Sequence, residues 1–435
     1  MSSYMAVKVR LDPTPRQERR MASHAGAARF AYNAGLAHVK EAIGGGEPPE
    51  WSHYSLRRWW NANKDELAVN QATGEVWWDQ NSKEAYSGAL RDLARGFSNW
   101  SKSRRGQRKG KRVGFPKFKS KNTTMRFAYS TGFTAPTASD PYGLKLPRIG
   151  RVHCMENVHE RISGARLIRI TVSRRAGNWY ASLTVEREPT APATAPKLGA
   201  VGVDLGVKNL ATLSDSTVIP SPRALSAKLR ALRKAQQALS RKVKGSARRE
   251  KAKGRVARLH ARVADVRADA INKATTMIAE NYSAVCIEDL NVAGMVKNRN
   301  LARSVSDAAL GEFRRQIEYK TARSGAVLRV VDRWFPSSKT CSNCGVVKVK
   351  LSLSERTFNC DACGLSIDRD VNAAINIKVA GSAPETLNAR GEDVRRANGM
   401  LGNADPGEAR TKRARKSAVR LGAGLGNEAI QPRIN

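Results

Sequence analysis

The sequence has 435 residues and a formal net charge of +39, because 77 lysines and arginines stand against 38 acidic residues. Such an excess of positive charge favours a polyanionic partner, since binding a nucleic acid releases its condensed counterions. No apolar run approaches the ~18 residues that cross a bilayer, and no apolar signal segment opens the chain, so we expect no membrane partner.

The N-terminal part combines strand patterns with a long helical one. Residues 6–11 alternate apolar and polar side chains, and residues 165–187 have the pattern of a β-hairpin. We predict a small β-barrel from residues 1–12 and 123–190, interrupted by a helical insertion over residues 13–122. The tryptophans of this insertion are predicted to pack in its core: Trp51, Trp59, Trp60, Trp77 and Trp78.

Two later segments are basic without acids to balance them. Residues 102–121 hold ten lysines and arginines and no acid. After a linker with Pro189, Pro192 and Pro196, residues 222–280 show the apolar periodicity of an antiparallel helical hairpin. From Arg223 to Arg267 this hairpin carries sixteen basic residues against two acids. A solvated coiled coil would alternate its signs, so both segments predict contacts with phosphate backbones.

Four of the six cysteines form two short knuckles, Cys341-Ser-Asn-Cys344 and Cys360-Asp-Ala-Cys363. Each CxxC turn directs two sulfurs to one side, and fifteen residues separate the two pairs. This spacing is typical of a four-thiolate Zn²⁺ site, so we predict a zinc ribbon over residues 336–367. The other two cysteines, Cys154 and Cys286, are far apart and are predicted to be reduced thiols, which fits a cytoplasmic protein.

The pattern over residues 198–380 alternates strands with helices. The predicted elements are a strand with its hairpin partner at 198–206 and 210–213, the basic hairpin, a strand at 285–288, a helix at 306–323, a strand at 326–331, the zinc ribbon and a helix at 370–379. This order is that of an RNase H-like α/β fold. Residues 381–435 are predicted to be a disordered basic tail.

Three carboxylates converge in such a fold. Asp204 lies on its first strand, Glu288 on a later strand, and Asp370 begins its last helix. Each adjoins an apolar run, and burying three carboxylates without compensation would cost several kcal/mol per ion. Two Mg²⁺ or Mn²⁺ ions about 4 Å apart would compensate, activate water and stabilise the leaving oxygen of a phosphodiester. We therefore predict that the three acids are catalytic metal ligands.

Local alternatives remain at two of these positions. Asp289 could replace Glu288, and Asp368 could replace Asp370. Any one acid taken alone is better explained as a strand-end residue that pairs with a nearby arginine. All three in this order, beside a zinc ribbon and in so basic a chain, favour catalysis.

The chain resembles the TnpB proteins of insertion sequences, which are relatives of the type V CRISPR effectors. The resemblance covers roughly residues 5–380 and is most specific in the C-terminal third. It is carried by Arg29-Phe-Ala-Tyr-Asn33, Gly114-Phe-Pro-Lys-Phe118, Gly202-Val-Asp204-Leu-Gly, Ile287-Glu288-Asp-Leu, Pro336-Ser-Ser-Lys-Thr-Cys341, the two cysteine knuckles and Asp368-Arg-Asp370-Val-Asn-Ala-Ala-Ile-Asn.

The resemblance implies an RNA-guided DNA endonuclease encoded by a transposable element, with Asp204, Glu288 and Asp370 as a RuvC-type site. It implies that the barrel is a wedge-like domain, that residues 13–122 are a recognition domain, and that residues 198–380 are a RuvC-like nuclease domain. The implied partners are a guide RNA from the transposon end and double-stranded target DNA beside a short flanking motif, with no protein partner evident. The implied setting is the prokaryotic cytoplasm, and the nucleoid when the protein is on its target.

Two alternatives keep parts of this interpretation. A guide-free RuvC-like nuclease, such as a junction resolvase, would share the metal site but is usually compact, whereas this chain has long helical segments. A non-catalytic zinc-ribbon regulator of transposition would need no divalent cation and would be indifferent to Asp204→Ala.

Overall fold

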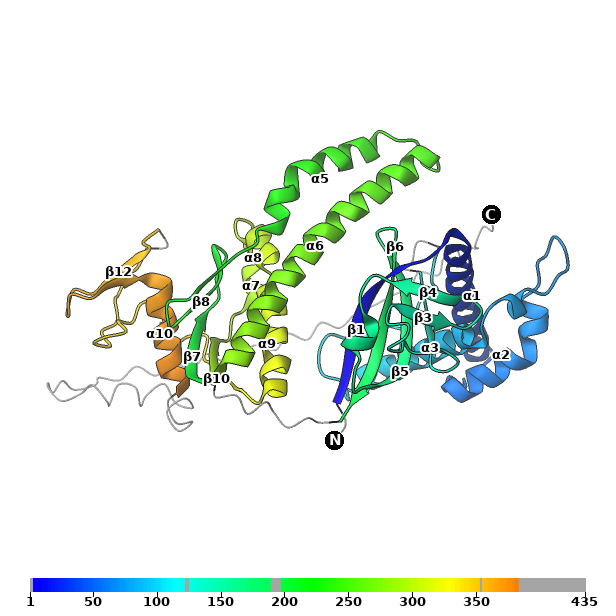
Figure 1. Cartoon of the computed structure of the whole chain (residues 1–435), viewed down its shortest axis with the longest axis horizontal. Helices are drawn as coiled ribbons and strands as arrows, with labels where there is room; N and C mark the ends of the chain where they lie inside the picture. The colour runs from blue at the N-terminus through cyan, green and yellow to red at the C-terminus, as the bar shows by residue number, and fades with distance from the viewer. Residues whose placement is uncertain (1–2, 122–124, 189–196, 353, 383–435) are drawn as a thin grey trace, which may run out of the picture. The chain divides into compact units, whose positions relative to one another are not determined.

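The structure is a computed structural model that describes residues 3–121, 125–188, 197–352 and 354–382 (Figure 1). The predicted basic tail therefore lies outside the described residues, apart from residues 381 and 382. Within the described residues, no helix is both long and apolar enough to cross a membrane.

The N-terminal strands form one antiparallel sheet of six, in the order β2-β5-β6-β1-β4-β3. β1 pairs with β6 along its length, so the start of the chain lies in the middle of a sheet whose other strands come more than 120 residues later. The predicted hairpin is confirmed as β5 and β6, with every second residue of β6 buried. The strands are β1 (Ser3–Asp12), β2 (Arg126–Tyr129), β3 (Gly143–Leu146), β4 (Gly150–Cys154), β5 (Arg166–Arg175) and β6 (Asn178–Arg187), and α4 (Val158–Arg161) precedes β5.

The two outer strands of this sheet approach each other through the segment that follows β2. Thr134 forms an isolated antiparallel bridge with Lys145 of β3, with N···O distances of 3.1 and 3.3 Å in the two directions. The described residues show no direct β2–β3 ladder. The sheet is thus half of a barrel, and full closure stays a prediction.

The helical insertion consists of α1 (Pro15–Gly44), α2 (His53–Leu67), the short 3-10 helix η1 (Trp78–Gln80) and α3 (Lys83–Arg104). A capping box at Thr14 and Gln17 starts α1, because each side chain satisfies the other's backbone N–H. Trp60 is buried, and its ring stacks on Tyr86 at 5.0 Å. The other predicted core tryptophans pack against the same core, as expected for structural rather than base-stacking residues.

The second sheet has five strands in the order β11-β10-β7-β8-β9. β7, β10 and β11 are parallel, while β8 and β9 are antiparallel to their neighbours. The strands are β7 (Leu198–Asp204), β8 (Asn209–Leu213), β9 (Val218–Pro220), β10 (Tyr282–Glu288) and β11 (Val327–Val331). The helices α7 (Val292–Met295), α8 (Ala302–Ala308), α9 (Leu310–Ser324) and α10 (Arg369–Ser382) belong to the same part of the chain, together with the two-stranded ribbon of β12 (Thr357–Asn359) and β13 (Ser366–Asp368).

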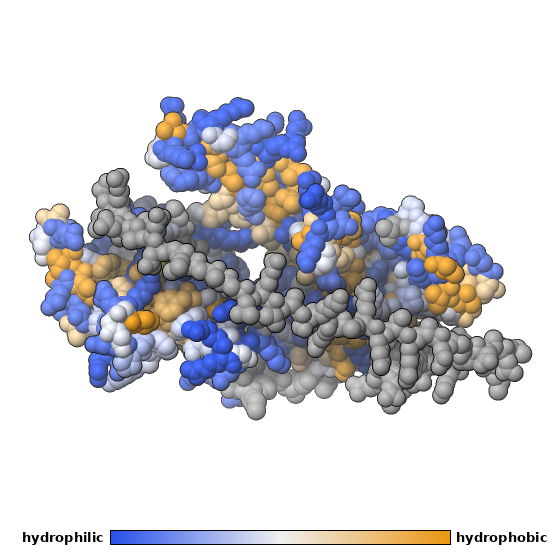
Figure 2. Space-filling view, turned by 180° about the vertical axis from the view of Figure 1, so that it is seen from behind, coloured by the Kyte–Doolittle hydropathy of each residue, from blue (hydrophilic) through white to orange (hydrophobic). Residues whose placement is uncertain are grey.

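The basic helical hairpin is confirmed as α5 (Ala224–Ser240) and α6 (Ala247–Asn281). Its seam is a small apolar cluster in which Leu232 and Val263 are buried. Hydrophilic side chains cover the end where the two helices connect, with apolar ones between them (Figure 2). The seam therefore holds the hairpin together while its basic residues stay exposed to solvent.

One predicted helix is wrong in its form. The helix expected over residues 306–323 is two helices, α8 and α9, separated at Ala309, whose φ is 52°. The break lies beside Asp307, a buried carboxylate that accepts hydrogen bonds from the backbone N–H of Leu225 and from Arg267, at 3.0 and 2.8 Å. Asp307 thereby binds the N-terminus of α5, where an acid is favoured by the helix dipole.

Candidate metal centres

The acidic cluster, Asp204, Glu288 and Asp370, gathers at one edge of the second sheet. β7 and β10 are parallel neighbours that pair Val203 with Ile287, so the next residue of each strand is an acid at the same edge. Asp370 lies in the first turn of α10. Three elements that are distant in the sequence therefore bring these acids together.

Gly202 allows α10 to approach this edge. A Cβ at Gly202 would lie 1.9 Å from the carbonyl oxygen of Ala374 and 2.6 Å from the backbone nitrogen of Lys378. Any other residue would push the α10 backbone away from β7. The glycine two positions before Asp204 thus sets the distance between the strand and the helix that carries Asp370.

The cluster concentrates negative charge. Burial raises the pKa of Asp204 to about 7, and the charges of Glu288 and Asp370 add to this, while Arg369 opposes it. Burial also raises the pKa of Glu288, which a hydrogen bond from Ser337 partly offsets. The nearby cations of the protein therefore do not neutralise the cluster, and carboxylate oxygens are the ligands that Mg²⁺ and Mn²⁺ prefer.

The two alternative acids have other partners. Asp368 caps α10, because one of its oxygens accepts the backbone N–H of Asp370 at 2.9 Å and of Val371 at 3.1 Å. Asp289 is exposed and forms an ion pair with Arg333. Asp370 also forms an ion pair, with Arg369 at 3.5 Å. The choice of Glu288 and Asp370 as metal ligands stays a prediction.

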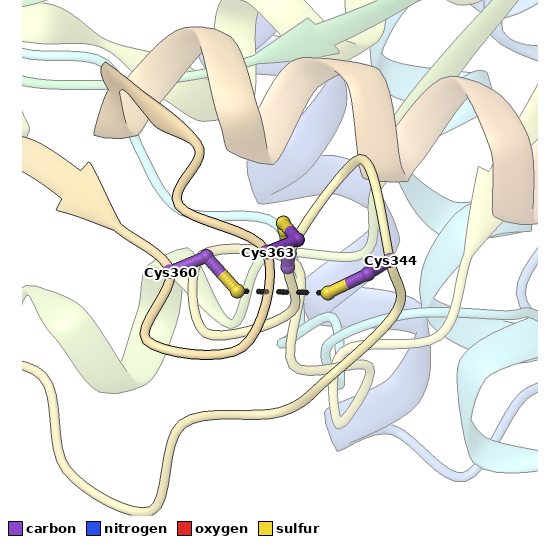
Figure 3. Close-up of side chains that lie close together, drawn as sticks. Cys344, Cys360 and Cys363 are labelled. Atoms are coloured by element: carbon purple, nitrogen blue, oxygen red, sulfur yellow. Dashed lines mark hydrogen bonds between the residues drawn. The ribbon is translucent and has the colours of Figure 1, made fainter.

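The four cysteines lie together, and their sulfurs are all within 4.8 Å of one another. The Sγ atoms of Cys341 and Cys363 are 3.7 Å apart. Those of Cys344 and Cys360, which point toward each other in Figure 3, are 3.5 Å apart. A tetrahedral Zn²⁺ with bonds of about 2.3 Å requires sulfurs about 3.8 Å apart. The tetrad therefore has the size of a zinc site, and among the described residues it is the only group of three or more His, Cys, Asp or Glu gathered so tightly.

The two knuckles have the same backbone construction. The N–H of Gly345 donates to the carbonyl of Cys341 at 3.0 Å, and that of Gly364 donates to Cys360 at 2.9 Å. Both glycines have a positive φ, near 75°, which suits glycine and ends each turn. Hydrogen bonds from the backbone of Leu365 and the side chain of Asn343 lower the pKa of Cys363 to about 6, which favours the thiolate that binds metal.

Three residues in these centres were missed as functional by sequence reasoning. Ser337 donates a hydrogen bond to the Glu288 carboxylate, and Asn372 and Asn376 bind backbone groups of residues 337–342. Their signal in the sequence is weak: two asparagines four residues apart after Asp370, and a serine four residues before Cys341.

Comparison with known proteins places the chain. Three family models match: "Probable transposase" over residues 182–299, "Cas12f1-like, TNB domain" over residues 311–377 and "Helix-turn-helix domain" over residues 1–47. A protein of Mycobacterium tuberculosis H37Rv named "Putative RNA-guided DNA endonuclease" is 38% identical, over 95% of this chain and 94% of that protein. InsQ of Escherichia coli K12, with the same description, is 32% identical over 88% of this chain and 94% of its own length.

The chain belongs to the TnpB family. A TnpB-like protein of Acanthamoeba polyphaga mimivirus matches a shorter stretch, at 29% identity over 26% of this chain and 22% of the viral protein. Among solved structures, a Cas12f1–sgRNA–target DNA complex aligns with a TM-score of 0.45 and 15% identity, over 87% of this chain and 99% of that chain. The relatives in Mycobacterium tuberculosis and Escherichia coli confirm the predicted TnpB resemblance.

Proposed function

We propose that the protein is an RNA-guided, divalent-metal-dependent DNA endonuclease encoded by a transposable element. The observation that carries the proposal is the convergence of Asp204, Glu288 and Asp370 at one sheet edge. The family supports it, since full-length relatives are named as RNA-guided DNA endonucleases. The order of strands and helices supports the RNase H-like, RuvC-type interpretation of this domain.

The acidic cluster performs phosphodiester hydrolysis in this proposal. Mg²⁺ or Mn²⁺, when bound, supplies Lewis-acid chemistry for the attacking water and the leaving oxygen. The charges of Glu288 and Asp370 both act on the pKa of Asp204, and these three carboxylates would hold the divalent cations. Glu288 is held by Ser337, and Asp370 by the start of α10.

Zn²⁺ is the proposed occupant of the cysteine tetrad. Four thiolates with no further protein ligand form a closed site, and closed sites of this type are structural. In this proposal the ion fixes the fold of residues 336–367, where the ribbon of β12 and β13 is only three residues long in each strand. Zinc therefore does not take part in the hydrolysis.

The proposed partners are a guide RNA from the transposon end and a double-stranded target DNA with a short flanking motif. The hairpin of α5 and α6 presents basic residues on both helices, and the segment after α3 adds further lysines and arginines. Such charge binds backbones without reading sequence, which suits a protein whose specificity comes from base pairing. Residues 13–122 act as the recognition domain and the half-barrel as the wedge-like domain.

The test is to express the protein with its native flanking DNA and to sequence the RNA that copurifies. We expect one discrete RNA whose 3′ end runs past the element boundary. DNA that matches this 3′ end should be cut in Mg²⁺. A heterogeneous mixture of cellular RNA, together with cleavage that needs no added guide, would favour the guide-free nuclease instead.

A further inference from the structure

Two asparagines of α10 bind the loop that enters the cysteine tetrad. Asn372 accepts the backbone N–H of Ser342 at 2.9 Å and donates to the carbonyl of Thr340 at 2.7 Å. Asn372 thereby holds the peptide groups on both sides of Cys341. It is fully buried, and a buried amide with both ends bonded holds its partners firmly, because breaking either bond would leave a polar group unsatisfied.

Asn376 lies one turn further along the same face of α10. Its side-chain nitrogen donates to the carbonyls of Ser337 and Thr340, at 2.8 and 2.7 Å. Like Asn372, it is buried. The two side chains together bind the backbone of residues 337–342, here called the coupling loop, at three separate residues.

The coupling loop also contacts the acidic cluster. The hydroxyl of Ser337 donates to a carboxylate oxygen of Glu288, and Ser337 is only 6% exposed. On the other side, α10 carries Asp370 two residues before Asn372. A continuous chain of contacts therefore runs from Cys341 through the loop to Glu288, and through α10 to Asp370.

We infer that the coupling loop makes the affinity of the acidic cluster for divalent cations depend on the cysteine tetrad. Ser337 is a positioning residue for Glu288, and Asn372 and Asn376 fix the loop relative to Asp370. The inference rests on the proposed function, because it assigns Mg²⁺ to the acids and Zn²⁺ to the cysteines. Because coupling between two sites is reciprocal, Mg²⁺ should also strengthen the retention of zinc.

The size of the effect follows from the contact that is lost. Residues that orient a metal ligand typically change metal affinity by about 10- to 100-fold when they are removed. Ser337 makes a single hydrogen bond to one carboxylate, so we expect the lower end, about tenfold, for Ser337→Ala. Ser337→Thr keeps the hydroxyl and should restore most of the affinity.

The experiment uses the full chain with its copurified RNA and compares Ser337→Ala with Ser338→Ala. Ser338 is the adjacent serine, and its side chain makes no hydrogen bond among those the structure describes. The primary readout is the Mg²⁺ concentration that gives half of the full Mg²⁺-dependent rise in melting temperature. Zinc per chain and the cleavage rate at saturating Mg²⁺ are measured on the same samples.

We expect Ser337→Ala to need about tenfold more Mg²⁺ for the same rise in melting temperature, with zinc content unchanged. A merely structural role would lower the melting temperature without moving the Mg²⁺ midpoint, and that result overturns the inference. So does a midpoint equal to that of Ser338→Ala. Either outcome leaves the proposed function intact as long as the wild type cuts DNA with Mg²⁺.

A second variant tests the zinc end of the coupling. Cys363→Ser removes one cysteine of the tetrad that lies outside the coupling loop. As zinc is lost, the Mg²⁺ concentration at the midpoint should rise. An unchanged midpoint in a zinc-free variant contradicts the inference. A wild type that is neither stabilised by Mg²⁺ nor cleaves DNA contradicts the proposed function itself, so the two failures are distinguishable.

Discussion

The cysteine tetrad and the acidic cluster are two proposed metal centres that are built in different ways. The tetrad takes its ligands from 23 consecutive residues, 341–363, in two knuckles of the same backbone geometry. The acidic cluster takes its ligands from two strands and a helix between residues 204 and 370. The first depends on local turns, whereas the second depends on the packing of α10 against β7 at Gly202.

The two centres also differ in their electrostatics without metal. In the tetrad, hydrogen bonds from the backbone of Leu365 and the side chain of Asn343 lower the pKa of Cys363 to about 6, whereas burial and the neighbouring cysteines raise the pKa of Cys344 to about 12. In the acidic cluster, burial and the charges of Glu288 and Asp370 raise the pKa of Asp204 to about 7, so this carboxyl is only partly ionised at neutral pH. Ionising the acidic cluster therefore costs free energy that a bound cation would offset.

The largest expected effect is a loss of DNA cleavage when Glu288 is changed but not when the adjacent Asp289 is changed. Glu288→Gln should lower DNA cleavage on the order of a thousandfold or more, because the ligand charge is lost. Asp289→Asn should stay near wild type, because Asp289 is exposed and surface ion pairs contribute little. Single-turnover cleavage with the copurified RNA measures both. A large loss in Asp289→Asn with Glu288→Gln near wild type would mean that the two acids have been assigned the wrong way round.

The next effect is the loss of zinc when the cysteine tetrad is altered. The double variant Cys341→Ser and Cys344→Ser should lose its zinc and the order of residues 336–367, because two of four ligands are gone. Zinc content is measured by plasma mass spectrometry, and local order by hydrogen exchange. Cys154→Ala is the matched control, since Cys154 is a buried cysteine outside the tetrad. Full zinc content in the double variant would show that other residues bind the metal.

A smaller effect tests the packing on which the acidic cluster depends. Gly202→Ala should destabilise the protein by about 1–3 kcal/mol, because the new methyl group would overlap the α10 backbone. Gly199→Ala, in the same strand but with open space at its Cβ, is the control. The melting temperature and the cleavage rate should both fall in Gly202→Ala and should stay near wild type in Gly199→Ala. A Gly202→Ala protein with wild-type stability would disprove the close approach of α10 and β7.

The smallest effect is a stability change with pH. Because the folded state raises the pKa of Asp204, it binds the proton more tightly than the unfolded chain, and the metal-free protein should lose stability as pH rises toward 7. Asp204→Asn removes this penalty, so its stability advantage should grow by roughly 1–3 kcal/mol between pH 5 and pH 8. Melting curves in a chelator measure it, and saturating Mg²⁺ should abolish it. An advantage independent of pH would contradict the raised pKa.

The sequence allowed much of this to be predicted where the signal is local. The cysteine knuckles, the hairpin of β5 and β6 and the basic helices all repeat a pattern over a few turns. The break at Ala309 could not be predicted, because alanine favours helix. Its left-handed backbone lies beside Asp307, whose contact with α5 is visible only in the structure.

Ser337, Asn372 and Asn376 were missed for a related reason. Asparagines at positions i and i+4 of a helix have the pattern of a solvated face, and they are buried here only because the coupling loop packs on them. The identity of the three acids stays a prediction, made because each follows or begins an element with a clear apolar pattern. Their convergence still depended on recognising the order of the strands and helices.

The most direct test of the two metal centres is anomalous diffraction from one crystal of the protein grown with Mn²⁺, recorded at the manganese and zinc edges. The account predicts manganese between the carboxylates of Asp204, Glu288 and Asp370, and zinc within the four cysteines. Manganese bound at other acids, or no manganese at this sheet edge while zinc fills the tetrad, would contradict the central claim that these three carboxylates form the catalytic metal site.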